Sequence, residues 1–391
     1  MDFYRRAEEL KEEIVSHRRF IHRNAESGLE LPVTAEYICG RLTEYGIQPQ
    51  KCGYGITACI GSGKPVILLR ADMDALPMDE DSGEKFASTN GCAHTCGHDF
   101  HAAMLLCAAR MLKEAESSLK GTVKLMFQPG EEIIKGCRNM IENGILENPV
   151  PDAALAFHVA AGRVPDGMFM YNSRGTMMYS ADHFRIKIQG KGGHGAYPGL
   201  AVNPLDMAVS IYHSLQGISA SETSPDASCM LTVCRICGGD NTNIIPHTAV
   251  MEGALRTDSS SCRHHIKQRI EGTVSAAAQM WGGCACTEWL SAVPPLVCDS
   301  KLTEDMAGYI RELPLPQLLP RGDMKASASE DFACIAEKLP SAMFYLSAGF
   351  DDSRGDYSAH HPKVMFNEDV CSFGAAAYAH CAARWLEENS I

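Results

Sequence analysis

The pattern of hydrophobic and polar positions before residue 182 switches repeatedly between helical and strand-like spacing. Apolar residues recur at helical intervals in three windows, and three short runs rich in leucine and β-branched residues are typical of buried strands. The helical windows are 4–22, 34–45 and 102–115, and the strand-like runs are 66–70, 122–127 and 153–157. Strands that alternate with helices predict an α/β fold, with a mostly parallel mixed sheet and helices on both faces.

The pattern changes after residue 182. Residues 184–189 alternate between apolar and polar side chains, which predicts a sheet with one solvated face. Further strands are predicted over 229–237 and 249–257, helices over 203–215 and 259–281, and a last helix over 371–389 after the α/β pattern has returned at Pro294-Pro295. We therefore predict a discontinuous main domain, residues 1–182 and 296–391, around an inserted α+β domain, residues 183–295.

The composition is that of a soluble globular protein, since 45% of the 391 residues are hydrophobic and 21% are charged. The longest apolar runs, such as 66–69, are too short to cross a bilayer, and no apolar signal segment follows Met1. We therefore expect a cytoplasmic protein without a membrane partner. The formal net charge of -13 and the lack of a basic stripe argue against a nucleic-acid partner.

Seventeen cysteines are a high count for such a chain. A disulfide scaffold is unexpected in a cytoplasmic protein of this length, so we expect most of these cysteines to be small buried residues. Cys234 and Cys237 have the spacing of a redox or zinc pair, but they lie in a strand-like run without a second pair nearby. We therefore interpret them as ordinary strand residues.

Potential metal ligands gather in two segments of the main domain. The segment 94–101 holds three histidines, Cys96 and Asp99, and the pair Glu131-Glu132 follows the strand over 122–127. Thiolate, imidazole and carboxylate groups are the ligands of catalytic divalent transition ions. Of two adjacent glutamates, one can bind the ion while the other handles the proton of a water molecule. The sequence therefore predicts a metal-dependent hydrolase.

Each of these groups also has a structural interpretation. Asp99 could be the N-cap of the helix over 102–115, and glutamate pairs are common in solvated turns. His158, at the end of the strand over 153–157, could be a satisfied core histidine, and His360-His361 could be exposed loop residues. The two interpretations differ in whether the segments converge on shared cations.

Ordered motifs over nearly the whole chain carry a resemblance. They are Arg70-Ala-Asp-Met-Asp-Ala-Leu-Pro77, Cys96-Gly-His-Asp99, Gln128-Pro-Gly-Glu-Glu132, His158-Val159, Gly190-Lys-Gly-Gly-His194, Asn243-Ile-Ile-Pro246, Ser329-Glu-Asp-Phe332 and His360-His-Pro362, with Arg18, Arg19, His22 and Glu26 near the start. Together they resemble the two-metal amidohydrolases and metallopeptidases related to aminoacylases and zinc carboxypeptidases. The similar branch is that of hippurate hydrolases, N-acyl-amino-acid amidohydrolases and auxin-conjugate hydrolases.

The resemblance implies a zinc-peptidase-like catalytic domain with two divalent ions per subunit, which could be zinc, manganese, cobalt or nickel. The implied ligands are Cys96, His98, Glu132, His158 and His360, with Cys96 as the bridge. Glu131 would be the general base, and Asp72 and Asp74 would orient ligand side chains from behind.

The resemblance also implies that the insert is a ferredoxin-like lid or dimerisation domain. His194 would stabilise the developing oxyanion, either when the domains close or from a partner subunit in a homodimer. Asn243 and Arg256 would hold the substrate carboxylate, which suits the forked guanidinium of Arg256. The implied substrate is a small N-acyl-L-amino acid, of the hippurate or N-acetyl type, whose amide bond is hydrolysed.

Three alternatives stay open. A dipeptidase or aminopeptidase of the same fold would recognise a free α-amino group instead of an acyl cap. A binding protein without turnover would keep the fold, although it has no use for the proton shuttle that Glu131-Glu132 offers. A structural zinc protein would hold its ligands in a tight cluster, unlike the spread from Cys96 to His360.

Overall fold

The computed structural model describes residues 1–222, 228–315 and 323–390, and these form two compact units. The larger unit comprises Met1–Met177, Val297–Lys325 and Cys334–Ile391, and the smaller unit comprises Met178–Leu296 and Ala326–Ala333. The smaller unit thus begins before the predicted 183 and takes in a segment that we had predicted for the main domain. The reason is local pairing, since Met178 forms a β-bridge with Ala326 and the Tyr179 N–H donates to the Ala328 carbonyl at 3.0 Å.

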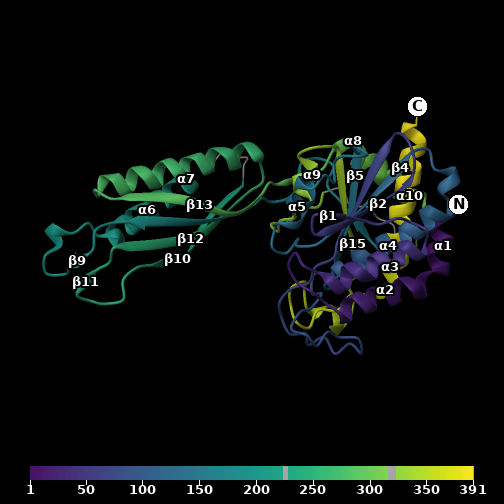
Figure 1. The fold of residues 1–391 in the computed structure, drawn as a ribbon, viewed down its shortest axis with the longest axis horizontal. Coiled ribbons are helices and arrows are strands. Elements are labelled where there is room, and N and C mark those ends of the chain that lie inside the picture. Colours follow the sequence, from purple (N-terminus) through teal and green to yellow (C-terminus); the bar gives the residue numbers. More distant parts are fainter. Residues whose placement is uncertain (223–227, 316–322, 391) are drawn as a thin grey trace. The chain divides into compact units, whose positions relative to one another are not determined.

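The larger unit is built on a seven-stranded sheet with the order β1-β2-β4-β3-β5-β15-β6 (Figure 1). The strands are β1 Gln50–Cys52, β2 Gly55–Gly61, β3 Val66–Asp72, β4 Thr122–Gln128, β5 Ala153–Ala160, β6 Phe169–Met170 and β15 Ser341–Ser347. Strands β4, β3, β5 and β15 run parallel, whereas β2 and β6 pair antiparallel at the flanks. The predicted mostly parallel mixed sheet is confirmed.

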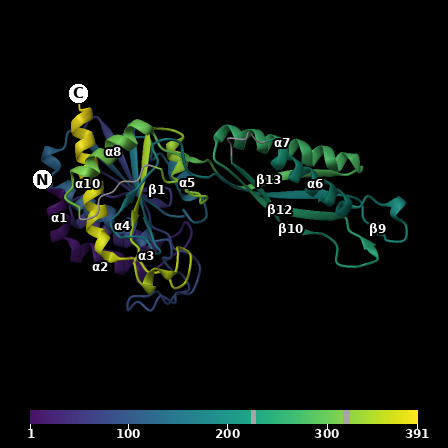
Figure 2. The same ribbon diagram turned by 180° about the vertical axis from the view of Figure 1, so that it is seen from behind.

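Helices pack on this sheet and on one another around an apolar core. The helices are α1 Phe3–Glu9, α2 Lys11–Arg23, α3 Pro32–Glu44, α4 His98–Glu114, α5 Gly136–Glu142, α8 Ser300–Glu312 and α10 Cys371–Asn389, while the short α9 Ala333–Ala336 begins in the smaller unit and ends in the larger one. Both α4 and α10 pack against β3. The two helices also pack against each other, and both can be followed in the two opposite views (Figures 1 and 2). The predicted helix over 4–22 is instead two helices that meet at Leu10. Among the described residues, no helix has the length and hydropathy that a bilayer crossing requires.

The smaller unit is a four-stranded antiparallel sheet, in the order β10-β12-β8-β13, with two helices packed on it. Its elements are β8 Ala181–Gln189, β10 Cys229–Cys237, β12 Thr248–Thr257, β13 Cys284–Val293, α6 Pro204–Ser221 and α7 Ser260–Met280. The predicted alternation is present, because Phe184, Ile186 and Ile188 are buried with the helices while Arg185 and Lys187 form ion pairs with glutamates. Strand β13 was not predicted, since its small cysteine, alanine and serine residues give a weak pattern.

Short elements complete the structure. A ribbon pairs β9 Gly193–His194 with β11 Ile244–Ile245. The other short elements are β7 Thr176–Met178, β14 Leu296–Val297, and the 3₁₀ turns η1 Glu116–Ser118, η2 Pro198–Leu200, η3 Ser353–Asp356 and η4 Glu368–Val370. Among the described residues, none of the seventeen cysteines forms a disulfide, but only seven are buried, so the expectation that most are core residues was wrong. Cys234 and Cys237 are exposed on β10, an edge strand.

Candidate active site

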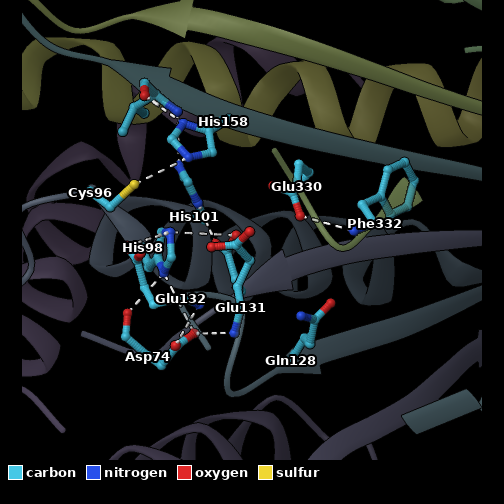
Figure 3. Close-up of polar contacts among 12 residues, drawn as sticks. Asp74, Cys96, His98, His101, Gln128, Glu131, Glu132, His158, Glu330 and Phe332 are labelled. Atoms are coloured by element: carbon cyan, nitrogen blue, oxygen red, sulfur yellow. Dashed lines mark hydrogen bonds and ion pairs between the residues drawn. The ribbon is translucent and has the colours of Figure 1, made fainter. Parts of the chain in front are cut away.

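The candidate site lies where parallel strands of the larger unit end. Asp72 is the last residue of β3, Gln128 is the last residue of β4, and His158 lies near the end of β5. Because neighbouring parallel strands end at the same edge of a sheet, ligand-binding groups converge there. Figure 3 shows Cys96, His98, His158 and the Glu131-Glu132 pair brought together at this edge.

The Glu131-Glu132 turn is held by a buried aspartate. One carboxylate oxygen of Asp74 accepts the Glu131 N–H at 3.0 Å, and the other accepts the Glu132 N–H at 3.1 Å. Glu131 is only 8% exposed, so this turn is not the solvated glutamate turn of the structural interpretation. Asp74 therefore fixes the backbone of both glutamates and leaves their side chains to face the site.

Two histidines present the same ring nitrogen to the site. His98 Nδ1 donates to the Asp74 carbonyl at 2.8 Å, and His158 Nδ1 donates to the Val159 carbonyl at 2.7 Å. A carbonyl can only accept, so Nδ1 donates in both rings and Nε2 is the nitrogen left to bind a cation. His158 Nε2 lies 3.5 Å from Cys96 Sγ, and His98 Nε2 lies 3.9 Å from Glu132 Oε1. Metal-binding histidines are typically fixed in this way through their second nitrogen.

His360 enters the site from a loop. Its backbone has φ 67°, in the left-handed region that is rare for a residue other than glycine, and its N–H donates to the Thr95 carbonyl at 3.0 Å. The ring Nε2 lies 3.3 Å from Glu132 Oε1. His361 instead stacks on Tyr357, with ring centroids 4.3 Å apart. Of the histidine pair, therefore, His360 is the one directed at the glutamate.

The donor set fits two cations. The ligand atoms of Cys96, His98 and His158 lie within 4.8 Å of one another, and so do those of Cys96, Glu132 and His360. Both groups contain Cys96, as a bridging ligand requires. Within the described chain, His98 Nε2 and Glu132 Oε1 are buried without a hydrogen-bond partner, which is costly unless a cation compensates them.

The pKa values of the Cys96 thiol and the His98 imidazole also favour a site that binds cations. Burial raises the pKa of the Cys96 thiol to about 12, so a thiolate at neutral pH requires positive charge beside it. Burial opposes charge on His98, yet Asp72 and Cys96 together raise the pKa of its imidazole well above the usual value. A bound divalent ion would take the place of these protons, because it stabilises the Cys96 thiolate and binds the neutral His98 ring.

His101 belongs to the site without facing the donor cluster. Its Nδ1 donates to Asp72 Oδ1 in a short hydrogen bond, and its Nε2 accepts the Val159 N–H at 2.8 Å. Arg70 Nη1 lies 2.9 Å from the other Asp72 oxygen. His101 therefore joins the end of β3 to the residue that follows His158, and it is a positioning residue.

Replacement of His101 by alanine should lower metal affinity by about 10- to 100-fold, because the Val159 N–H and Asp72 would lose their shared partner. Competition with a chromogenic chelator measures this affinity. The control is His380→Ala, since His380 pairs with Glu312 at 2.9 Å in a partly exposed ion pair away from this cluster. Equal metal affinities of the two variants would contradict the positioning role.

Asp99 is not the N-cap of α4, contrary to the structural interpretation. The helix begins after Gly97, which has φ 87° and, as a glycine, no side chain that could cap the helix. The buried Asp99 carboxylate instead accepts Arg18 Nε at 2.7 Å and pairs with His22 Nδ1 at 2.8 Å. Arg18 and His22 thereby anchor the start of α4 to α2, directly behind Cys96 and His98.

The site residues expected in the smaller unit lie at two places. His194 and Asn243 are neighbours on the β9–β11 ribbon, where the Gly195 N–H donates to the Asn243 carbonyl at 2.8 Å. Arg256 is near the far end of β12, eight residues beyond Thr248 and so about 26 Å along the strand. Its guanidinium donates to Ser329 Oγ at 2.7 Å. The structure thus brings His194 and Asn243 together, but it does not bring Arg256 to them.

Tyr345 is a residue that sequence reasoning did not single out. Its ring stacks on His158 with centroids 4.8 Å apart and an interplanar angle of 28°. The parallel register of β15 and β5 pairs Tyr345 directly with His158. Only the register of these two strands reveals the contact.

The carboxyl edge of this largely parallel sheet gathers cysteine, histidine and glutamate ligands in two overlapping sets, and a second, buried glutamate lies beside them. Such a site defines a two-metal hydrolase. The model of peptidase family M20/M25/M40 matches residues 68–384, and the chain belongs to this family. It is a metal-dependent amidohydrolase with two divalent ions, and the resemblance read from the sequence is confirmed.

Similar proteins span nearly the whole chain. The N-acetyl-L-cysteine deacetylase of Bacillus subtilis (strain 168) is 36% identical and the match covers 97% of this chain and 90% of that protein. An IAA-amino acid hydrolase of Arabidopsis thaliana is 35% identical, over 99% of this chain and 88% of its own length. The crystal structure of a dinuclear metal binding peptidase of the M20 family from Bacillus subtilis has a TM-score of 0.81 and 27% identity, over 98% of this chain and 100% of that chain.

Proposed function

We propose that the protein hydrolyses the amide bond of small N-acyl-L-amino acids, of the N-acetyl or hippurate type, and releases a carboxylic acid and a free amino acid. The observation that carries this proposal is the pair Glu131-Glu132, whose backbone one aspartate holds. Glu132 lies in the ligand group of Cys96 and His360, whereas Glu131 lies close to His98 and to Glu132 itself. The names of the two relatives, which act on an acylated cysteine and on acylated amino acids, support the substrate class.

In this proposal, Cys96, His98, Glu132, His158 and His360 hold the two ions. When bound, the ions would supply Lewis acidity, which lowers the pKa of a water molecule toward neutral pH and polarises the amide carbonyl. Glu131 takes the proton of the attacking water and delivers it to the leaving nitrogen, so it acts first as base and then as acid. Asp74 keeps Glu131 in place through its backbone, and Asp72 and His101 hold the histidine ligands in orientation.

A substrate panel tests the acyl requirement. Metal-loaded protein is assayed with N-acetyl amino acids, N-benzoyl amino acids and free dipeptides, before and after chelation. We expect kcat/KM for the best acylated substrate to exceed that of the best dipeptide by about tenfold or more, since an acyl pocket has no partner for an ammonium group. Preference for dipeptides would favour the peptidase alternative, and no turnover of any amide would favour the binding protein.

We propose zinc, manganese, cobalt or nickel as the native ions, because a mixed set of thiolate, imidazole and carboxylate ligands accepts all four. Reconstitution of chelated protein with each metal, followed by the same assay, ranks them. Restoration by magnesium alone would contradict a site that contains a cysteine ligand. We also retain the proposal of a cytoplasmic protein, which subcellular fractionation would test.

We propose that His194 donates to the developing oxyanion and that it does so from the partner subunit of a homodimer formed through the smaller unit. His194 and Arg256 are too far apart along one chain to hold the same small substrate, so two subunits would be needed to supply both. Size-exclusion chromatography with light scattering should therefore report a dimer.

His194→Ala should lower kcat by about 10²–10³-fold and leave the metal content unchanged, as expected for loss of one oxyanion donor. Mixing this variant with Glu131→Ala subunits, each nearly inactive alone, should restore activity if His194 acts across the interface, because one site of each mixed dimer is then complete. If subunit exchange restores no activity, His194 acts within its own subunit. An unchanged kcat of His194→Ala would contradict the oxyanion role.

A further inference from the structure

Two cysteine thiols of the larger unit, Cys137 and Cys334, are hydrogen-bonded to each other. Cys137 is the second residue of α5 and is fully buried, and Cys334 is the second residue of α9 and is 8% exposed. The Cys137 thiol donates a hydrogen bond to the Cys334 sulfur. Helices α5 and α9, labelled close together in Figure 1, therefore meet through two sulfur atoms.

The surroundings of Cys334 favour a reactive sulfur. The hydrogen bond from Cys137 lowers the pKa of the Cys334 thiol against the effect of burial, and the neighbouring Arg138 lowers it further. By contrast, burial raises the pKa of Cys371 and Cys381. Since the thiolate is the form that attacks an oxidant, Cys334 should react before these two.

The thiol pair connects the start of α5 with the place where the chain returns from the smaller unit to the larger unit. The N–H groups of Lys135 and Gly136 donate to the Gly130 carbonyl at 3.1 and 3.0 Å, so the start of α5 is tied to the turn of the two glutamates. Cys334 is the first residue of the larger unit after the segment Ala326–Ala333 of the smaller unit. A bond between the sulfurs would link the glutamate turn to a crossing between the units.

We propose that Cys137 and Cys334 are a reversible oxidation site, at which a peroxide forms a disulfide that slows turnover. The Cys334 thiolate attacks one oxygen of hydrogen peroxide, the O–O bond breaks, and a sulfenic acid and hydroxide form. The Cys137 sulfur then attacks the sulfenic sulfur, the S–S bond forms, and the S–O bond breaks. Two thiols lose two electrons in total, one peroxide becomes two water molecules, and a thiol reductant reverses the change.

The test uses the full metal-loaded protein and stoichiometric hydrogen peroxide. After free thiols are blocked, trypsin cleavage places Cys137 in peptide 136–138 and Cys334 in peptide 326–338, and neither peptide contains another cysteine. We expect a linked peptide two hydrogens lighter than the sum, which dithiothreitol removes. We expect kcat for N-acetylmethionine to fall about threefold or more and to recover with the reductant, as for a restrained conformational step.

Two variants and one internal control sharpen this test. Cys334→Ser should give no linked peptide and no reversible loss of kcat, whereas Cys137→Ser should leave a sulfenic acid at Cys334 that dimedone traps. Cys229 and Cys262 are also in contact, but burial raises the pKa of both thiols, so they should stay reduced at this dose.

Oxidation of other thiols without the 137–334 link would overturn the proposal, and so would a link with unchanged kcat. The turnover measurement depends on the proposed function, but the mass measurement does not. If the reduced protein cleaves no acylated amino acid, that result counts against the proposed function, while the linked peptide still decides whether the thiols are an oxidation site.

Discussion

Glu131→Gln should lower kcat by about 10³–10⁴-fold while both ions stay bound, because the substitution removes a general base and keeps the shape of the side chain. The turn should keep its geometry, since Asp74 holds the backbone N–H groups and not the glutamate side chains. Steady-state kinetics and elemental analysis of the same preparation measure the two quantities.

The matched control is the neighbouring residue. Glu132→Gln changes an adjacent side chain on the same anchored turn, but Glu132 Oε1 lies 3.3 Å from His360 Nε2 and within the ligand group that contains Cys96. This variant should lose metal as well as activity, and excess metal should restore part of the activity. Equal metal content in the two variants, or equal loss, would contradict the proposed division of labour between the two glutamates.

The fold could be predicted wherever the spacing of apolar residues along the chain reflects which residues are buried. Strands β3, β4 and β5 are buried along their whole length and appear as short apolar runs, and β8 shows strict alternation. Strand β13 was not predicted because most of its residues are only partly buried and many of its side chains are small. The return of Ala326–Ala333 to the smaller unit depends on backbone pairing with 178 and 179, which no side-chain pattern encodes.

The candidate site divides in the same way. The segments that hold Cys96 and the glutamate pair stand out by residue type, and the structure brings them to one edge of the sheet. The position of His101 between Asp72 and Val159 depends on which strands are neighbours. The separation of Arg256 from Asn243 depends on the direction of β12. Such facts follow from topology and register, and a single sequence states neither.

The second large effect concerns stability. Arg70 is fully buried, with Nη1 2.9 Å from Asp72 and Nε donating to Gln128 at 3.0 Å. Burial opposes ionisation of Asp72, but Arg70 and two histidines hold the pKa of its carboxyl well below the usual value. In metal-free protein, Arg70→Met should therefore lower the free energy of unfolding of the larger unit by about 3–5 kcal/mol, because a buried carboxylate loses its main countercharge.

Tryptophan fluorescence can isolate this unit. Trp385 is its one tryptophan, whereas Trp281 and Trp289 belong to the smaller unit, so urea unfolding is followed in a background with both of these replaced by phenylalanine. The control is Arg5→Met, because Arg5 is 80% exposed and pairs with Glu9 at 3.4 Å. Its effect should stay within about 0.5 kcal/mol, as for other exposed ion pairs.

A double substitution separates charge from packing in this loss of stability. If the uncompensated Asp72 carboxylate is the cause, adding Asp72→Asn to Arg70→Met removes the charge. The loss of unfolding free energy in the double variant should then be about 2 kcal/mol smaller than the sum of the losses in the two single variants. If the loss came only from the volume and hydrogen bonds of the arginine, the two effects would add. The shortfall therefore measures how strongly a buried ion pair, directly behind the histidine ligands, depends on both of its members.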